Sequence, residues 1–279
     1  MSVNEHAATR TQHEIWNGPV GAAWVRHAEI HDQQAAPFGQ AAMDAVGPVD
    51  GARVLDVGCG TGATVTQLLC RGAGAVLGID MSVPMIDAAR ARNQSLDARF
   101  EAGDVLDLQP SEPYDVIFSR FGVMFFTDPS AAFEHLRTLA ARPVRLGFCC
   151  WGPPAANPLM AVPVMATIPV LGPPGLAAPG EPGPFSLSSP ELIRDVLGAA
   201  GWSDITVGEL TIEQPHPAGD ADAVADVVVE FSPPIVEGLL RAPERGGATR
   251  AAIAEALRPL ERNGVVHLRA SALIVTAQG

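Results

Sequence analysis

Short apolar runs alternate with amphipathic stretches along most of the chain, and this rhythm indicates the fold class. Runs of strand length occupy residues 53–58, 75–80, 98–105, 114–120, 144–151, 204–213 and 265–277. The stretches 63–72, 83–92, 129–142 and 186–202 have the apolar spacing and the capping residues of helices. Strands that alternate with helices form a mostly parallel sheet with helices on both faces. The pattern therefore predicts a doubly wound α/β protein.

The segment before the first strand is also predicted to be helical. Residues 13–46 have a helical pattern, which we expect to break at residues 18–19 and at Pro37. Trp16 and Trp24 are eight positions apart, which would place them on one face of a helix. Such a face either packs against the core or covers a ligand as a lid.

The regular rhythm stops after the fifth strand. Residues 152–184 contain ten of the 25 prolines, so we expect neither a central strand nor one long helix there. The prediction is a short broken helix and a loop over the edge of the sheet. Regularity returns where Ser188 and Glu191 match a capping box and Gly201 matches a helix stop. Residues 220–262 then predict two more helices.

The composition excludes several classes of partner and chemistry. The 279-residue chain is 47% hydrophobic, which allows a large core, and its net charge of −13 disfavours nucleic acids and anionic membranes as partners. All 18 basic residues are Arg, which excludes lysine Schiff bases and a P-loop. The N-terminus has no secretion signal, and no uninterrupted apolar run is long enough to span a membrane. We therefore expect a cytoplasmic protein that binds neither nucleic acid nor membrane.

The cysteines and histidines predict no metal site. The cysteines form no C-x-x-C pair and have no zinc-ligand spacing; they are Cys59, Cys70, Cys149 and Cys150. His27 and His31 are four positions apart, but no further ligand is evident, so a surface or cap position is preferred for both. Reduced thiols in a cytoplasmic protein are the expected state.

A glycine-rich loop follows the first strand and indicates a ligand. Residues 58–62 read Gly-Cys-Gly-Thr-Gly directly before a helix. Glycines let the backbone approach a ligand without an intervening Cβ, and ligands of open α/β sheets bind at the carboxyl ends of the strands. The loop matches the dinucleotide pattern loosely, so by itself it also admits NAD.

Three carboxylates after successive strands discriminate between these ligands. Asp56 precedes the first glycine, where it would repel a pyrophosphate but accept hydrogen bonds from an ammonium group. Asp80 ends the second strand and can accept the two hydroxyls of a ribose, while Asp104 follows the third strand and can accept an adenine amino group. These groups suit a ligand with an amine, a ribose and an adenine but no phosphate, as in S-adenosylmethionine.

The runs VLDVGCGTG, GIDMS, GDVLD and YDVIFSRFGVMFF, in this order, resemble the class I S-adenosylmethionine-dependent methyltransferases, close to the ubiquinone/menaquinone-biosynthesis type. The match covers residues 13–150, the final helix and the last strands. The resemblance implies a Rossmann-like, seven-stranded, mostly parallel sheet whose last strand, residues 265–277, is antiparallel. Segments 152–184 and 220–262 depart from the plain family core and imply a Pro-rich, α-helical cap, so the acceptor stays open.

The resemblance also implies roles for individual residues. Asp56, Ser119 and Arg120 would face the methionine end of the donor, Asp80 would bind the ribose, and Asp104 would contact the adenine. The residues expected to bind the cofactor are Trp16, Trp24, Asp56, Gly58, Cys59, Gly60, Thr61, Gly62, Asp80, Met81, Ser82, Met85, Gly103, Asp104, Val105, Ser119 and Arg120.

Catalytic residues are less evident than the cofactor site. In-line methyl transfer needs mainly alignment in a dry pocket, because a neutral thioether is a good leaving group. Arg120, His31 and His216 are weak catalytic candidates, and Arg120 is equally suited to a structural ion pair. No metal is expected.

The expected organisation is an N-terminal helical lid at residues 1–46, a donor-binding core at 47–151, a Pro-rich cap insertion at 152–185, and the rest of the core at 186–279 with a helical insertion at about 217–263. The predicted reaction transfers a methyl group to a small, fairly hydrophobic acceptor in secondary or quinone-like metabolism, and S-adenosyl-L-homocysteine is the product. A monomer or homodimer is expected. An S-adenosylmethionine enzyme of other chemistry, a non-catalytic binding protein and a nicotinamide-dependent oxidoreductase remain open alternatives.

Overall fold

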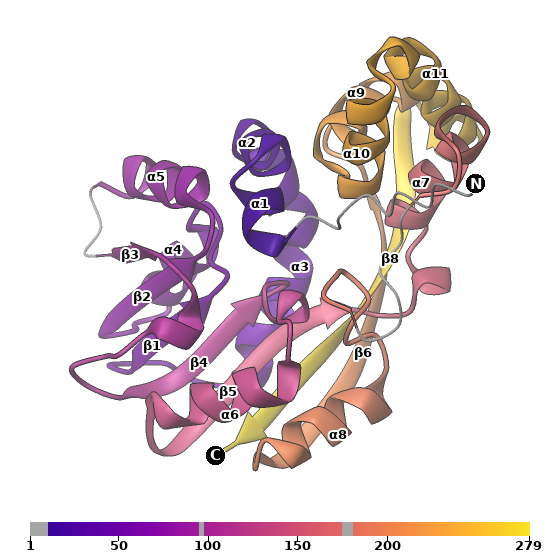
Figure 1. Ribbon diagram of the computed structural model, residues 1–279. Helices are drawn as coiled ribbons and strands as arrows, with labels where there is room; N and C mark the ends of the chain where they lie inside the picture. Colours follow the sequence, from indigo (N-terminus) through magenta and orange to yellow (C-terminus); the bar gives the residue numbers. More distant parts are fainter. Residues whose placement is uncertain (1–10, 95–97, 175–180) are drawn as a thin grey trace, which may run out of the picture.

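The computed structural model describes residues 11–94, 98–174 and 181–279, which form one central sheet with helices on both faces (Figure 1). The strand order is β3-β2-β1-β4-β5-β8-β6. The strands are β1 (Arg53–Val57), β2 (Ala75–Asp80), β3 (Arg99–Ala102), β4 (Tyr114–Arg120), β5 (Ala140–Trp151), β6 (Ser203–Pro215) and β8 (Val265–Gln278). Strands β1 to β5 pair in parallel, whereas β8 is antiparallel to both β5 and β6. This confirms the predicted fold class; the two-residue strand β7 (Glu261–Arg262), which pairs with β8, is an addition.

Two helical layers cover the sheet. The layer on one face contains α3 (Ala28–Val46), α4 (Ala63–Cys70) and α5 (Val83–Arg92), and the other contains α6 (Pro129–Thr138) and α8 (Pro190–Ala199). Because side chains alternate along a strand, Leu55 and Val57 of β1 pack on the α6–α8 side while Val54 packs on the α3–α4 side. Asp56 lies between them in sequence and therefore points to the α4 side.

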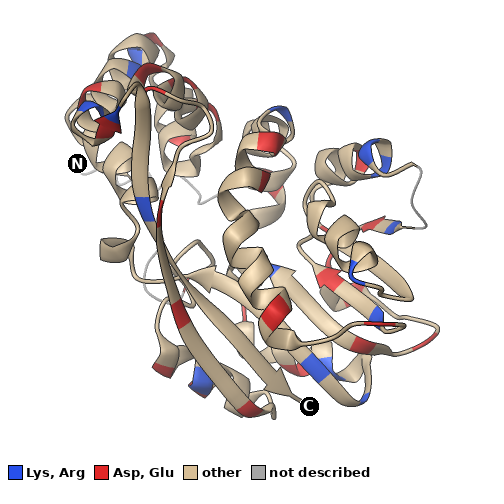
Figure 2. Cartoon of the chain, turned by 180° about the vertical axis from the view of Figure 1, so that it is seen from behind, with Lys and Arg blue, Asp and Glu red and all other residues tan. Residues whose placement is uncertain are grey.

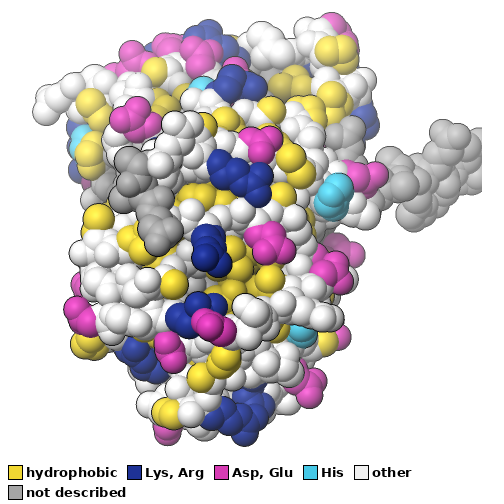
Figure 3. Space-filling model, turned by 90° about the vertical axis from the view of Figure 1, so that its left-hand side faces the viewer, with side chains coloured by type: hydrophobic (Ala, Val, Ile, Leu, Met, Phe, Trp, Pro, Cys, Tyr) yellow, Lys and Arg dark blue, Asp and Glu magenta, His cyan; other side chains and the backbone are white. Residues whose placement is uncertain are grey.

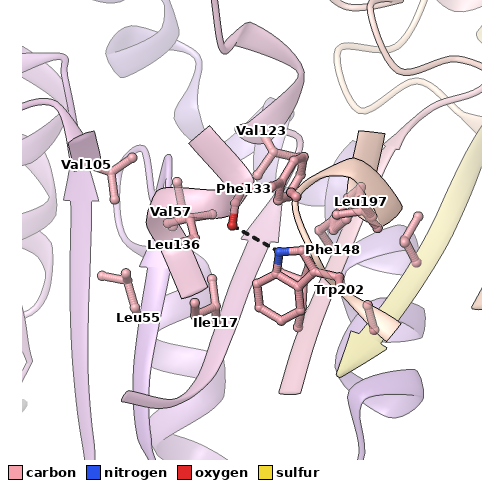
Figure 4. Close-up of a cluster of buried hydrophobic side chains, with 14 of the residues drawn as sticks. Leu55, Val57, Val105, Ile117, Val123, Phe133, Leu136, Phe148, Leu197 and Trp202 are labelled. Atoms are coloured by element: carbon pink, nitrogen blue, oxygen red, sulfur yellow. Dashed lines mark hydrogen bonds between the residues drawn. The ribbon is translucent and has the colours of Figure 1, made fainter. Parts of the chain in front are cut away.

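The core under α6 and α8 is held by apolar packing and one buried polar contact (Figure 4). Phe133 and Leu136 of α6 pack with Phe148 of β5 in the same cluster as Leu197 of α8. The indole N–H of Trp202 donates to the carbonyl of Phe133 at 3.0 Å, so this large side chain is buried without leaving its nitrogen unpaired.

A second group of helices, which we name the helical cluster, packs around the extended parts of β6 and β8 (Figure 1). It consists of α7 (Pro158–Leu171), α9 (Ala221–Phe231), α10 (Pro233–Arg241) and α11 (Gly246–Leu257). Its core contains Val228, Ile235 and Ile253 together with Val266 and Leu268 of β8. The short 3-10 helices of the chain are η1 (Val105–Asp107), η2 (Val123–Phe125), η3 (Pro154–Ala156), η4 (Pro243–Arg245) and η5 (Arg258–Leu260).

Two expectations about prolines were wrong. Residues 158–171 form one continuous helix, α7, with Pro163 and Pro169 inside it, and Pro37 lies inside α3 rather than ending a helix. An internal proline costs about 3 kcal/mol of helix stability. In α7 the burial of Pro163 and the packing of the helix against α10, α11 and β8 offset that cost, as the buried face of α3 does for Pro37. Residues 175–180 of the Pro-rich segment lie outside the described residues.

Two further corrections concern the second half of the chain. Ser189, not Ser188, caps α8 by accepting the Leu192 N–H. Residues 220–262 contain α9, α10 and α11 rather than two helices, because Pro233 directly after Ser232 starts a new helix.

The short N-terminal helices lie between α5 and α9 (Figure 1). They are α1 (Gln12–Trp16) and α2 (Pro19–Arg26), and the chain turns between them at Asn17 and Gly18. Trp16 and Trp24 therefore do not share one helix face as predicted; they meet because the turn folds α2 back against α1.

Charged residues are spread over the molecule rather than segregated by sign. Acidic and basic positions occur on both the sheet layers and the helical cluster (Figure 2). On the face seen in Figure 3, basic and acidic side chains alternate, and hydrophobic atoms show between them. Within the described ranges, every helix is too short or too polar to cross a lipid bilayer.

Candidate functional site

The glycine loop adopts a backbone that only glycine takes readily. Gly58, Gly60 and Gly62 have φ values of 69°, 54° and 86°. A Cβ on Gly58 would lie 2.8 Å from Cα of Gly122, and one on Gly62 would lie 2.8 Å from the Phe100 ring. At Gly60 the nearest atom would be 3.9 Å away, at the Met85 sulfur. Gly58 and Gly62 are thus required by packing, whereas the Gly60 backbone has open space beside it.

Asp80 fastens this loop to the end of the second strand. One of its carboxylate oxygens accepts the Gly60 N–H at 2.9 Å, and the other accepts the Ser82 N–H at 2.9 Å. Burial raises the pKa of Asp80, and the two backbone hydrogen bonds oppose that rise. Each oxygen retains a lone pair, so the carboxylate can accept two ribose hydroxyls while it holds the loop.

Asp56 is fully buried under the loop and is only half satisfied. Its Oδ2 accepts the Thr64 hydroxyl, while its Oδ1 has no hydrogen-bond partner among the described residues. Burial raises the pKa of Asp56 to about 7, although the Thr64 hydrogen bond and the charge of Arg120 act to lower it. A buried acceptor without a donor is costly, and an ammonium group of a ligand would supply one.

The third carboxylate has a structural partner of its own. Asp104 is exposed and caps η1, its Oδ1 accepting the Leu106 N–H at 3.0 Å. The Gly103 N–H donates to the Asp80 carbonyl at 3.0 Å, which places residues 103 and 104 at the same edge of the sheet as the loop. Val105 is buried, and its carbonyl is 3.2 Å from a ring nitrogen of His135.

The remaining loop residues predicted to contact the cofactor are tied to neighbouring elements. Cys59 is buried against Gly78, and burial raises the pKa of its thiol far above the ordinary value, so it is no nucleophile. The Thr61 hydroxyl accepts a hydrogen bond from the Arg92 guanidinium at 2.7 Å. The Met81 carbonyl accepts a hydrogen bond from the Asn17 side-chain amide at 3.0 Å.

Strand β4 delivers Ser119 and Arg120 to this edge. The Ser119 hydroxyl donates to the Val57 carbonyl at 2.7 Å and accepts the Gly122 N–H at 3.2 Å, so it joins the two loops. The Arg120 Nη2 forms an ion pair with Asp32 of α3 at 2.8 Å, while its Nη1 is buried without a partner among the described residues. Phe121 follows with a φ of 61°, a strained value for an aromatic residue, and such strain concentrates at functional sites.

Aromatic side chains from separate elements converge above this edge, and we name them the aromatic wall: Trp16, Trp24, His31, Phe125 and Phe231. The Trp16 ring is 5.6 Å from Trp24 and 5.2 Å from Phe125. His31 stacks on Trp24 at 3.8 Å and is 4.6 Å from Phe231 at the end of α9. The wall therefore joins the N-terminal helices, the β4 loop and the helical cluster.

The histidine candidates occupy different environments. A surface or cap position was expected for His31; its side chain is buried on Trp24. Burial, with the charges of His27, His216 and Arg120, lowers its pKa to about 3. Burial lowers the pKa of His216 to about 4, and its Nδ1 accepts the Ala218 N–H. His27 lies at the junction of α2 and α3, 3.1 Å from Glu230. The described histidines, cysteines and carboxylates form no cluster of three or more able to hold a metal.

Sequence reasoning missed several residues that build this site. Asp32 accepts hydrogen bonds from both Arg120 and Arg92, and Asn17 bonds Met81 and Val83. The only sequence signal for Asp32 was its position directly after His31. Gly122 and Phe125 follow β4 directly, a place where ligand contacts are common in this kind of sheet.

Two surface hollows, of about 340 Å³ and about 310 Å³, lie elsewhere. The first is lined by residues such as Met43 and Arg71, and the second by Pro19, Leu240 and their neighbours. Neither is lined by the unpartnered Asp56 or Arg120 atoms, so we assign the functional site to the glycine-loop edge.

Comparisons with known proteins identify the family. Residues 54–142 match the family described as "Methyltransferase domain". The chain is 31% identical over 172 residues to a demethylmenaquinone methyltransferase from Roseiflexus sp. (strain RS-1), covering 55% of this chain and 69% of that protein. It is 30% identical over 204 residues to nocamycin O-methyltransferase from Saccharothrix syringae, covering 66% of this chain and 71% of that protein.

Solved structures show the same fold. The YcgJ protein of Bacillus subtilis has a TM-score of 0.55 at 16% identity, over 84% of this chain and 94% of that chain. A Haemonchus contortus phosphoethanolamine N-methyltransferase in complex with S-adenosyl-L-methionine has a TM-score of 0.51 at 16% identity, over 87% of this chain and 52% of that chain. The solved structures show the class I fold, and the sequence relatives show that the chain belongs to the S-adenosylmethionine-dependent methyltransferase family.

Proposed function

We propose that this methyltransferase moves the methyl group of S-adenosylmethionine to a small, fairly hydrophobic acceptor and releases S-adenosyl-L-homocysteine. The observation that carries the proposal is the arrangement of Asp56, Gly60 and Asp80 at one sheet edge, directly below the aromatic wall. The donor would be held from below by the loop, and the acceptor would enter from the side of the helical cluster.

The residues present fit the donor. The free Oδ1 of Asp56 can accept hydrogen bonds from its ammonium group, and Asp80 can accept those of its ribose hydroxyls. The open side of Gly60 lets the backbone approach it. Asp104 and the Val105 N–H remain the proposed contacts of the adenine.

The bound donor supplies an activated methyl group on a positively charged sulfur. The chain's own residues must then align the acceptor with that group and exclude water. Alignment of reacting groups can lower a barrier by about 7–11 kcal/mol. Trp16 and Trp24 close the site from above, and the Ser82 hydroxyl anchors Trp16 by donating to its carbonyl at 2.7 Å. On this basis we propose that residues 1–46 act as a lid. Residues 1–10 of this segment lie outside the described part of the chain.

The cap favours an apolar acceptor. Phe231 of the wall is the last residue of α9 in the helical cluster. We propose the segment at 152–185 as one half of the acceptor pocket and the segment at about 217–263 as the other. The chain is similar to enzymes named for a quinone precursor and for nocamycin, which supports a small molecule as acceptor. We further propose that the enzyme works in the cytoplasm as a monomer or homodimer, without a nucleic-acid or membrane partner; its unpaired thiols support a reducing compartment.

The test combines binding and turnover. Calorimetry should show S-adenosyl-L-homocysteine binding in the micromolar range, and NADH should give no heat. A donor with a radiolabelled methyl group should then label compounds in a panel of phenols, acids, amines and quinones, or in an extract of small molecules. Binding without any label transfer would favour a non-methylating or non-catalytic role, and tight NADH binding alone would refute the donor site.

A further inference from the structure

Three buried nitrogen atoms, two in the aromatic wall and one on Arg120, have no hydrogen-bond partner among the described residues. They are Nε1 of Trp24, Nε2 of His31 and Nη1 of Arg120. Trp24 and His31 are stacked ring on ring at 3.8 Å, and Arg120 binds Asp32, the residue that follows His31 on α3. An indole N–H and a guanidinium N–H can only donate, so two of the three nitrogens call for an acceptor atom from a ligand.

Arg120 is close to two carboxylates: it pairs with Asp32, and its charge also acts on the buried Asp56. Asp32 is shared by two cations, Arg120 at 2.8 Å and Arg92 at 3.2 Å, so one positive charge is left uncompensated by this pairing. The Arg120 side chain is only 12% exposed, because it packs against α3 at Gly39. A Cβ on Gly39 would lie 2.8 Å from the Cδ of Arg120. A nearly buried guanidinium with a free N–H attracts an anion strongly, since little water competes for it.

The nearby histidines are poor proton acceptors. Burial lowers the pKa of His31 to about 3 and that of His216 to about 4. Neither ring can efficiently remove a proton from a neutral phenol or alcohol near pH 7. An acceptor that is already ionised at neutral pH needs no such base, and His31 can serve it as a neutral hydrogen-bond donor.

We propose that Arg120, His31 and Trp24 form an oxyanion subsite and that the acceptor is an apolar carboxylic acid, methylated as its carboxylate. This inference rests on the proposed methyltransferase function. The apolar body of the acid lies against the aromatic wall, and one carboxylate oxygen is held by Arg120 while the other faces the donor.

The reaction balances without proton transfer. A lone pair on the free carboxylate oxygen forms the new O–CH3 bond, the CH3–S bond breaks, and its electron pair stays on sulfur. The negative charge of the acid and the positive charge of the sulfonium disappear together. The products are a methyl ester and a neutral thioether.

The experiment compares each acid with its neutral amide on enzyme saturated with S-adenosyl-L-homocysteine. The probes are cinnamate, benzoate, 4-hydroxybenzoate and decanoate with the matching amides, and binding is followed by calorimetry. We expect at least one acid to bind ten times more tightly than its amide. Arg120→Gln should reduce that preference at least tenfold, and Trp24→Phe and His31→Phe, which keep aromatic rings, should reduce it three- to tenfold each.

The controls distinguish a failure of the oxyanion subsite from a failure of the proposed methyltransferase function. Arg194→Gln removes an exposed arginine on α8, outside the site, and should leave the acid preference unchanged. If wild-type enzyme fails to bind S-adenosyl-L-homocysteine, the proposed function itself is wrong. If it binds that product but prefers no acid over its amide, or keeps the preference in Arg120→Gln with circular dichroism unchanged, only the oxyanion subsite is refuted.

Discussion

Gly58 and Gly122 pack backbone against backbone at the carboxyl edge of the sheet. A Cβ on Gly58 would lie 2.8 Å from Cα of Gly122, and a Cβ on Gly122 would lie 2.6 Å from the Val57 carbonyl oxygen. The loop that follows β1 and the loop that follows β4 therefore touch without any side chain between them. This contact sets how closely the glycine loop approaches the loop that follows Arg120.

Gly122→Ala should disturb both stability and donor binding. The added methyl group has no room, and the backbone around it must shift, which costs about 1–3 kcal/mol in the free energy of unfolding. Urea unfolding checks this value, and calorimetry with S-adenosyl-L-homocysteine should show a loss of affinity. In the control Gly198→Ala on α8, no atom lies within 4 Å of the new Cβ, so stability should rise by about 0.5–1 kcal/mol. Equal behaviour of the two variants would contradict the close-packing argument.

Asp80→Asn should weaken donor binding and loosen the glycine loop together. The amide has only one acceptor oxygen, so it cannot accept both the Gly60 and the Ser82 N–H groups and also two ribose hydroxyls. The loss of charge-assisted hydrogen bonds predicts at least a tenfold lower affinity for S-adenosyl-L-homocysteine, at about 1.5–3 kcal/mol for each bond lost. Asp87→Asn, an exposed change on α5, should leave the affinity unchanged. Wild-type affinity in Asp80→Asn would show that the carboxylate does not meet the ribose.

Asp56 should make the ligand-free protein less stable as the pH rises. Burial raises its pKa from 3.8 to about 7 in the folded state. Between these two values the unfolded chain releases the proton more readily than the folded one, so the free energy of unfolding falls with rising pH, by at most about 1.4 kcal/mol per pH unit. Below pH 3.8 the stabilisation is fully present, and above about pH 7 the loss is complete.

The measurement is urea unfolding of wild type and Asp56→Asn from pH 5 to pH 8. The lowered pKa values of His31 and His216 act in the opposite direction, but both proteins contain them, so the difference between the two curves isolates Asp56. Asp56→Asn should gain stability relative to wild type up to about pH 7. Parallel curves would mean that Asp56 titrates at its ordinary pKa.

Asn17→Ala should release the N-terminal helices from the donor edge. The Asn17 side chain donates to the Met81 carbonyl at 3.0 Å and accepts the Val83 N–H at 2.9 Å, so it fixes the turn between α1 and α2 on the loop that follows β2. We expect faster hydrogen exchange in residues 11–26 and a three- to tenfold lower affinity for S-adenosyl-L-homocysteine. Gln33→Ala, an exposed change on α3, is the matched control. Unchanged exchange rates in Asn17→Ala would argue against a lid anchored here.

Local sequence patterns predicted those features of the structure whose physical cause lies within a few residues. The glycines of residues 58–62 follow from residue type and spacing. The same is true of the helix caps, because Ser82 accepts the Met85 N–H at the start of α5 and Asp128 accepts the Ala131 N–H at the start of α6. Local patterns did not predict α7, where packing against α10, α11 and β8 outweighs the cost of Pro163. Local patterns also did not predict how Trp16 meets Trp24, because their contact depends on the turn between α1 and α2.

The sequence by itself determined the α/β class, the parallel strands and the positions of Asp56, Asp80 and Asp104 at or just after the ends of successive strands, since strand periodicity and strand-end position decide these features. Only the tertiary structure decided that Asp32 joins Arg120 to Arg92 and that His31 is buried on Trp24. It also decided that Nε1 of Trp24, Nε2 of His31 and Nη1 of Arg120 find no partner in the part of the chain that the structure describes. These relations connect α2, α3, α5 and β4, which lie far apart in the chain, and packing of the helices onto the sheet is what brings them together.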